Sequence, residues 1–177
     1  MLRDGLALLI SEAELRSGVA RLARQIDQDY ATTGLVLVCL LKGATVFTAD
    51  LLRALRAEVH RIEFVRASSY GSGTTSSGRV SITGALPAEH IAGQHVLAVD
   101  DIADTGHTCV AVAEYINSLA PASLRYCTLL DKPERRQADV RYDYVGFTIP
   151  NHFVVGYGMD FDERYRGLPA VYYFPDR

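Results

Sequence analysis

The sequence predicts an α/β fold: a mainly parallel, twisted sheet with helices on both faces. Three observations predict it. Strand-like and helix-like stretches alternate along the chain, which is typical of helices that connect parallel strands. The strand-like stretches are short and almost wholly apolar, as buried parallel strands are. The chain has 177 residues, 49% of them hydrophobic, which is enough to bury the core of one domain. We therefore expect a single domain over residues 1–177.

Each element follows from its local pattern. Ser11 with Glu14 forms a capping box, and apolar residues then recur at helical spacing through Ile26. Two further helices are predicted at 44–56 and 108–119. The stretches predicted as strands are 35–41, 61–66, 95–99, 124–130, 144–148 and 153–157.

One stretch of the chain has low complexity. Residues 70–78 read YGSGTTSSG, and such glycines and small polar residues cannot bury enough surface to order themselves. Loops of this length inside a compact domain are usually functional or disordered. We expect a mobile loop at about residues 70–79.

Composition and charge exclude several classes of protein. The net charge is −3 and the arginines are scattered, so we expect no nucleic-acid partner. Cys39, Cys109 and Cys127 lack metal-ligand spacing and lie among apolar residues, which indicates buried free thiols in a reducing compartment. The longest apolar run, residues 35–41, is too short to span a membrane, and the N-terminal run LALLI is too short for a signal peptide. We expect a cytoplasmic protein with no membrane partner.

The segment VLAVDDIADTGHT, residues 96–108, concentrates the candidate chemistry. Asp100 and Asp101 follow an apolar strand, and ligands of such sheets bind beyond the carboxyl ends of the strands. Residues 104–108 then make a tight turn into a helix, where free backbone N–H groups and hydroxyls can hold a phosphate. Carboxylates beside a phosphate site suit a ligand with sugar hydroxyls, a magnesium ion, or a proton to be removed. A lone Asp-Thr-Gly would indicate only a helix start, but three acids together favour a ligand site.

This segment resembles the phosphoribosyl-diphosphate (PRPP) binding motif of the type I phosphoribosyltransferases. Further segments resemble, in order and spacing, the bacterial hypoxanthine-guanine phosphoribosyltransferases. They are LLKGA at 40–44, ASSYGSG at 67–73, LLDKPERR at 129–136 and VGFTIPNHFVVGYGMDFDERYRGLP at 145–169. The resemblance covers most of the chain from about residue 35 to 169. It implies the type I phosphoribosyltransferase fold, with a small hood subdomain from the terminal segments that includes a C-terminal region at about 150–177.

The resemblance also implies a function. The enzyme would transfer the 5-phosphoribosyl group from PRPP to N9 of hypoxanthine or guanine, giving IMP or GMP and pyrophosphate, with Mg²⁺ as cofactor. Its partners would be these small-molecule substrates and further copies of itself, in a homodimer or homotetramer.

The resemblance assigns roles to individual residues. Asp104 would be the catalytic base that accepts the purine N7 proton. PRPP and its 5′-phosphate would be bound by Asp100, Asp101, Asp104, Thr105, Gly106, His107 and Thr108. Pyrophosphate would be bound by Lys42, Gly43 and Arg166, and the family often has a non-proline cis peptide just before this lysine. Ser69 and Tyr70 would begin the mobile loop. The purine would be bound by Lys132, Phe153, Val154 and Asp160, and the metal by Asp100, Asp101 and Asp160.

Some points stay open at the level of sequence. Asp100 stands where the family generally has glutamate, Ala44 where it has glycine or serine, and Asn151 where aspartate is common. The order of preference among hypoxanthine, guanine and xanthine is not determined, nor is the role of His107. Two other classes of protein have other sequence features: a PRPP-binding regulator of the same fold would need a basic face, and an aspartyl phosphatase usually has Asp-x-Asp at the strand end. Neither feature is present.

Overall fold

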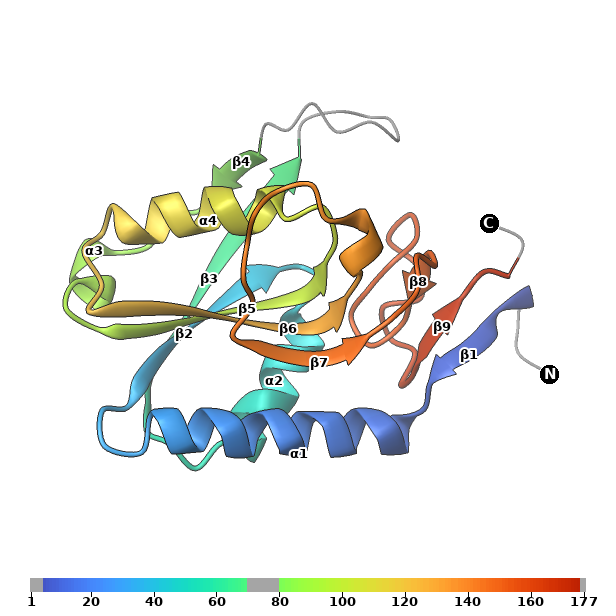
Figure 1. Ribbon diagram of the computed structural model, residues 1–177, viewed down its shortest axis with the longest axis horizontal. Coiled ribbons are helices and arrows are strands. Elements are labelled where there is room, and N and C mark those ends of the chain that lie inside the picture. The colour runs from blue at the N-terminus through green and yellow to red at the C-terminus, as the bar shows by residue number, and fades with distance from the viewer. Residues whose placement is uncertain (1–4, 70–79, 176–177) are drawn as a thin grey trace.

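The computed structural model describes residues 5–69 and 80–175 and contains two sheets (Figure 1). The strands are β1 Ala7–Ile10, β2 Leu35–Leu41, β3 Val59–Ser69, β4 Val80–Thr83, β5 His95–Ala103, β6 Ser123–Asp131, β7 Tyr144–Thr148, β8 Val154–Val155 and β9 Val171–Tyr173. The helices are α1 Glu12–Asp29, α2 Thr45–Ala54, α3 Ala88–Ile91 and α4 His107–Asn117, with a 3₁₀ turn at Pro133–Arg135. The larger sheet has the order β4-β3-β2-β5-β6-β7. Its strands pair in parallel except β4, which is antiparallel to β3.

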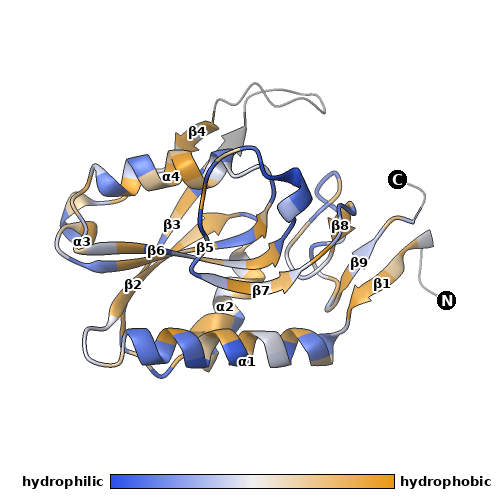
Figure 2. Ribbon diagram, viewed as in Figure 1, coloured by the Kyte–Doolittle hydropathy of each residue, from blue (hydrophilic) through white to orange (hydrophobic). Residues whose placement is uncertain are grey.

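Helices cover both faces of this sheet, α1 and α2 on one and α3 and α4 on the other (Figure 1). Successive side chains of a strand point to opposite faces. In β2, Leu35 and Leu37 therefore pack with α1 and α2, whereas Val36 and Val38 pack with α4. Hydrophobic residues run along β2, and α1 alternates hydrophobic and hydrophilic residues (Figure 2). The predicted fold class is confirmed.

The capping box that was predicted for the first helix is present. The Glu14 N–H donates to Ser11 Oγ at 3.3 Å, and the Ser11 N–H donates to Glu14 Oε2 at 2.8 Å. The buried face of α1 is the stripe expected from its spacing, and it includes Leu22 and Ile26. The first N–H groups of a helix have no partners within the helix. The capping box supplies such a partner for α1 and so defines where the helix begins.

The smaller sheet joins the two ends of the chain. Its order is β1-β9-β8, and β9 is antiparallel to both neighbours. It lies at one end of the molecule, beside the carboxyl ends of β5 and β6 (Figure 1). This sheet is the hood expected from the terminal segments. That residues 1–177 form a single domain with a hood region at about 150–177 stays a prediction, and the mobile loop predicted at about 70–79 lies outside the described residues.

Two strands differ from the prediction in ways that concern the site. The strand predicted at 95–99 continues to Ala103, so Asp100 and Asp101 lie within its C-terminal part, with Asp100 opposite Thr128 of β6. The strand predicted at 153–157 is shortened to β8 and belongs to the antiparallel hood sheet. It ends there because Gly156 has a φ of 95°, a conformation that leaves the strand.

Other expectations concern the cysteines and membranes. Cys39, Cys109 and Cys127 are all buried and free, as predicted. Among the helices of residues 5–69 and 80–175, none combines the length and the apolar character that crossing a membrane requires.

Candidate active site

Two adjacent acids form the deepest part of the site. Asp100 is buried, with 7% of its surface exposed, and Asp101 is partly buried. The Asp101 N–H donates to Asp100 Oδ1 at 3.0 Å. Burial, followed by the charge of Asp101, raises the pKa of Asp100 well above its usual range, and burial also raises the pKa of Asp101. Within the described residues neither carboxylate forms an ion pair, so this end of β5 favours a cation or hydroxyl donors.

The turn after these acids presents backbone donors. α4 begins at His107, and its N-cap is Gly106, which has a φ of 90° and supplies no side-chain cap. A Cβ at Gly106 would lie 2.8 Å from Val140 Cγ2, so the position admits only glycine. The Thr105 carbonyl accepts N–H groups from Gln137 and Ala138 at 2.9 and 3.0 Å, which fixes the turn. The uncapped first N–H groups of α4 and the hydroxyls of the turn are therefore free to hold a phosphate.

The side chain of His107 contacts Gln137, which limits the ways in which this residue can bind a phosphate. Its Nε2 lies 3.1 Å from Gln137 Oε1, so the ring is directed at residue 137. The phosphate-binding role predicted for this residue therefore depends on its main-chain N–H.

Asp104 is held by two arginines from the segment after β6. Arg135 Nε lies 3.0 Å from Asp104 Oδ1, and Arg136 Nη1 donates to the Asp104 carbonyl at 3.0 Å. Arg136 also forms an ion pair with Asp131. The contact of Arg135 with the carboxylate had no signal in the sequence. The predicted base is thus already oriented in the free chain.

Lys132 lies beside the acids because β5 and β6 are neighbours in the sheet. Its N–H donates to the Ala103 carbonyl at 3.0 Å, and only 7% of the residue is exposed. Burial lowers the pKa of Lys132, and the charge of Asp104 opposes that shift. An ammonium group held in such a buried position is a directed hydrogen-bond donor.

The Lys42–Gly43 loop packs closely against Asp101. The peptide bond between Leu41 and Lys42 is cis, as the resemblance implied. A Cβ at Gly43 would lie 1.8 Å from Asp101 Oδ2. On its other side, a Cβ at Gly158 would lie 2.2 Å from the Gly43 carbonyl oxygen. The loop therefore passes between the end of β5 and the segment after β8.

The segment after β8 carries the other predicted pyrophosphate and metal residues. Arg166 Nη2 lies 2.7 Å from Asp160 Oδ1, and Arg166 Nη1 donates to the Gly158 carbonyl at 2.8 Å. Glu163, which the sequence did not single out, bridges the two predicted pyrophosphate cations. Its carboxylate lies 2.8 Å from Lys42 Nζ and 3.2 Å from Arg166 Nη2. Lys42 and Arg166 are thus brought together across 124 positions of sequence, 166 minus 42.

The hood contributes aromatic side chains. Phe153 is 43% exposed, and its ring packs edge-to-face with Phe161, with centroids 5.6 Å apart, and against Phe174 at 6.1 Å. Val154 is buried in β8. Ser69 is the last residue of β3, and Tyr70 lies outside the described residues. An aromatic ring supported on one side and exposed on the other can stack on a flat heterocycle.

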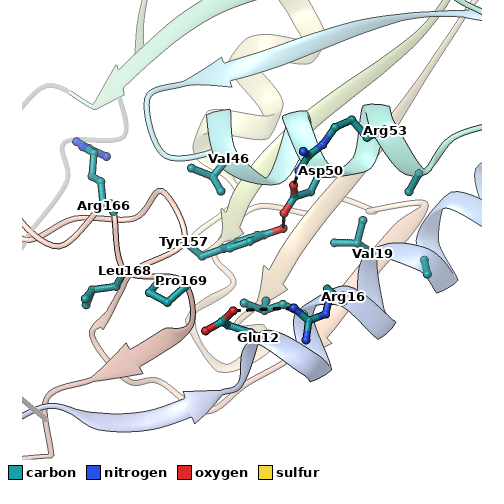
Figure 3. A pocket seen from close by; sticks show the side chains of 14 residues that line it. Glu12, Arg16, Val19, Val46, Asp50, Arg53, Tyr157, Arg166, Leu168 and Pro169 are labelled. Atoms are coloured by element: carbon teal, nitrogen blue, oxygen red, sulfur yellow. Dashed lines mark hydrogen bonds and ion pairs between the residues drawn. The ribbon is translucent and has the colours of Figure 1, made fainter.

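A separate pocket of about 770 Å³ lies between α1, α2 and the segment 157–169 (Figure 3). Tyr157 crosses it, and its hydroxyl donates to Asp50 Oδ2 at 2.5 Å. Arg166 lies at one end with its guanidinium directed away from Tyr157 and Asp50 (Figure 3). Of the predicted site residues that the structure describes, only Arg166 lines it, so this pocket is not the site that the acids form.

The metal residues form two groups. Asp100 and Asp101 are adjacent in β5, whereas Asp160 is paired with Arg166. In the part of the chain that the structure describes, no three side chains of His, Cys, Asp or Glu gather as a metal cage. A magnesium ion here would therefore need ligands from a substrate.

Comparisons with known proteins show which family the chain belongs to. The family model for the phosphoribosyl transferase domain matches residues 10–162. The chain belongs to this family. It is 48% identical over 166 residues to a hypoxanthine phosphoribosyltransferase of Salmonella typhimurium, with 93% of this chain and 92% of the relative covered. It is 46% identical over 171 residues to a hypoxanthine-guanine phosphoribosyltransferase of Mycobacterium tuberculosis, with coverage of 93% and 84%. A crystal structure of a hypoxanthine-guanine phosphoribosyltransferase from Bacillus anthracis superposes with a TM-score of 0.89 at 42% identity, covering 94% of this chain and 97% of that one.

Proposed function

We propose that this phosphoribosyltransferase acts in purine salvage, transferring the 5-phosphoribosyl group of PRPP to N9 of hypoxanthine or guanine. One observation carries the proposal: an acid pair at the end of β5, an uncapped helix N-terminus and a buried lysine meet at one edge of the sheet. These groups match ribose hydroxyls, a 5′-phosphate and a 6-oxo group respectively. The names of the relatives, hypoxanthine and hypoxanthine-guanine phosphoribosyltransferase, support the same reaction.

PRPP binding follows from the turn and the acids. The 5′-phosphate would accept hydrogen bonds from the first N–H groups of α4 and from the hydroxyls of Thr105 and Thr108. Asp100 and Asp101 would accept hydrogen bonds from the ribose hydroxyls. Their negative charge would also favour the positive charge that develops on the ribose as pyrophosphate leaves.

The donor set suits Mg²⁺. Asp100 and Asp101 offer hard oxygen ligands without a cation partner in the described chain, and the raised pKa values of both carboxyls show how costly their charges are without one. Mg²⁺ is usually held by one or two carboxylates together with substrate phosphates and water, which fits a site lacking a protein cage. When bound, the ion would neutralise charge on the leaving pyrophosphate. Asp160 would take part only after release from Arg166.

Asp104 would act as the general base. Arg135 and Arg136 orient it from the segment that also carries Lys132. Accepting the N7 proton while N9 attacks raises the nucleophilicity of the purine, a contribution of about 10²–10⁴ in rate for a positioned base. The contact with Arg135 has to loosen as the proton arrives, because a protonated Asp104 no longer attracts a guanidinium.

The base would be selected by Lys132 and stacked by Phe153. A 6-oxo group accepts a hydrogen bond from the Lys132 ammonium, whereas the 6-amino group of adenine cannot. A site built for such a bond discriminates strongly, because the unmatched substrate leaves a buried donor unpaired. The exposed side of Phe153 offers the stacking surface, and the main chain at Val154 would contact the purine edge.

Pyrophosphate would be bound by Lys42, the main chain of Gly43 and Arg166. Lys42 and Arg166 already lie on opposite sides of a single carboxylate, that of Glu163. The proposal extends to a homodimer or homotetramer in the cytoplasm. In support, a 40% identical hypoxanthine phosphoribosyl transferase of Trypanosoma cruzi has an oligomeric state and activity in which its C-terminal region has a role.

The test is a direct assay. The purified protein is incubated with PRPP and Mg²⁺ and, in separate reactions, with hypoxanthine, guanine, xanthine and adenine, and the nucleotide products and pyrophosphate are measured. We expect IMP and GMP, little AMP, and loss of turnover with a magnesium chelator. Turnover that is absent with every 6-oxopurine, or equal with adenine, would contradict the proposal.

A further inference from the structure

Glu163 lies where the two cations proposed for pyrophosphate meet. Its Oε1 is 2.8 Å from Lys42 Nζ, and its Oε2 is 3.2 Å from Arg166 Nη2 and 3.4 Å from Arg166 Nε. One carboxylate oxygen thus faces each cation, as two oxygens of a diphosphate would. A glutamate side chain is ordinarily an anion at neutral pH, and here it lies between two cations.

The backbone builds this position for the carboxylate. Phe161 and Arg164 exchange N–H to carbonyl hydrogen bonds of 3.2 and 3.0 Å, and the two residues between them, Asp162 and Glu163, have φ of 52° and 60°. Tight turns with two positive φ angles favour asparagine and glycine. The Glu163 N–H also donates to Asp160 Oδ2 at 2.9 Å. A glutamate is therefore held in a conformation that glycine would adopt more readily, with its carboxylate directed at Lys42 and Arg166.

These contacts can be exchanged for those of a substrate. The Glu163 side chain is 64% exposed and that of Lys42 is 46% exposed, and exposed ion pairs are weak. Arg166 keeps two other acceptors, Asp160 Oδ1 at 2.7 Å and the Gly158 carbonyl at 2.8 Å. Release of Glu163 therefore frees Lys42 and one side of Arg166 while the guanidinium stays in place.

We propose that Glu163 is an internal competitor of the diphosphate. This inference rests on the proposed function. The carboxylate holds Lys42 and Arg166 in the free enzyme, is displaced when PRPP binds, and returns to them as pyrophosphate leaves. It weakens binding of both molecules and speeds release of the product, so Glu163 sets the balance between PRPP affinity and product inhibition.

The test compares two substitutions in the same turn. Glu163→Gln removes the competing charge at constant size. Asp162→Asn is the matched control, because Asp162 is exposed and has no ion pair among the described residues. Binding of magnesium pyrophosphate and of PRPP is measured by calorimetry. From the exposed pair with Lys42 and the partly exposed pair with Arg166 we expect Glu163→Gln to bind both about 2- to 10-fold more tightly than the wild type. Asp162→Asn should stay within about two-fold, the smaller effect expected of an unpaired surface charge.

Steady-state kinetics and a third variant complete the test. Glu163→Gln should lower the KM for PRPP and let pyrophosphate inhibit at lower concentration, by the same factor. Glu163→Gly suits the positive φ and should show the same tightening, so a folding defect of one variant does not decide the result. Unchanged or weaker binding by both Glu163 variants overturns the inference, as does equal tightening by Asp162→Asn. A wild-type protein that binds neither PRPP nor magnesium pyrophosphate would instead overturn the proposed function, and the inference with it.

Discussion

Replacing Asp100 by asparagine should make the protein more stable and its substrate binding weaker. Asp100 is 7% exposed and lies beside Asp101, and burial together with that neighbouring charge raises its pKa. Asparagine has the same shape and keeps an acceptor for the Asp101 N–H, now 3.0 Å from Asp100 Oδ1. Removing the buried charge should therefore stabilise the fold at neutral pH by about 0.5–2 kcal/mol, the range that single stabilising substitutions commonly reach. For a chain of this size that is a rise in Tm of about 1–8 °C.

The raised pKa of Asp100 also predicts how the stability difference between the variant and the wild type changes with pH. Because the folded-state pKa of Asp100 lies above the ordinary aspartate value of 3.8, the folded protein binds this proton more tightly than the unfolded chain does. The resulting stability is present below pH 3.8 and is lost as the pH rises through the raised pKa. The Tm advantage of Asp100→Asn should thus be smaller at pH 4.5 than at pH 8.5.

The assay is thermal unfolding across this pH range, with and without PRPP and Mg²⁺. Saturating ligand at about 100 times its Kd should stabilise the wild type by about 2.7 kcal/mol, and the variant much less. The exposed Asp139→Asn serves as control. A Tm of Asp100→Asn below that of the wild type, or an advantage that does not grow with pH, would refute the reasoning.

Three further substitutions test other parts of the site. Asp104→Asn should lower the single-turnover rate about 10²–10⁴-fold and leave PRPP affinity nearly unchanged; a variant that loses affinity and keeps its chemical rate would remove Asp104 from the role of base. Lys132→Ala should raise the KM for hypoxanthine and guanine far more than the KM for PRPP, and equal losses would place Lys132 outside the purine site. Gly158→Ala, at φ 101° and with its Cβ 2.2 Å from the Gly43 oxygen, should lower stability by about 1–2 kcal/mol or more and raise the KM for PRPP. Gly167→Ala, which meets nothing within 4 Å, should do neither, so equal effects would contradict the packing argument.

Hydrophobic periodicity predicted the large sheet because its strands are buried on both faces. The apolar run of β2 and the capping box of α1 appear at the predicted places. The same signal missed β1, β4, β9 and α3, which have only four, four, three and four residues. Such short elements depend on partners distant in sequence, as β1 does on β9, and their own residues carry too little pattern.

Some residues of the site could also be predicted from the sequence, and others could not. The acids and the phosphate turn were readable from one continuous segment, because strand, turn and helix follow directly there. The extension of β5 to Ala103 could not be predicted from the sequence, because the two aspartates near the end of the strand interrupt its apolar pattern. Arg135 and Glu163 were missed for another reason. Each acts through a residue more than 30 positions away, Asp104 and Lys42, and local spacing says nothing about such pairs.

The charged residues of the site differ in how deeply they are buried, and burial determines whether each has a partner in the free chain. The more exposed ones are paired within the free chain, Asp104 with Arg135 and Lys42 with Glu163, and the half-buried Asp160 is paired with Arg166. Exposed pairs cost little to break, so substrate groups can replace the first two readily. The deepest charges, Asp100 and Asp101, have no such partner in the described residues. An internal cation there would form a buried pair that is costly to open, and PRPP with its metal could displace it only by losing much of its binding energy. Leaving the acid pair without a cation destabilises the free protein, and it reserves the strongest electrostatic contact of the site for the substrate.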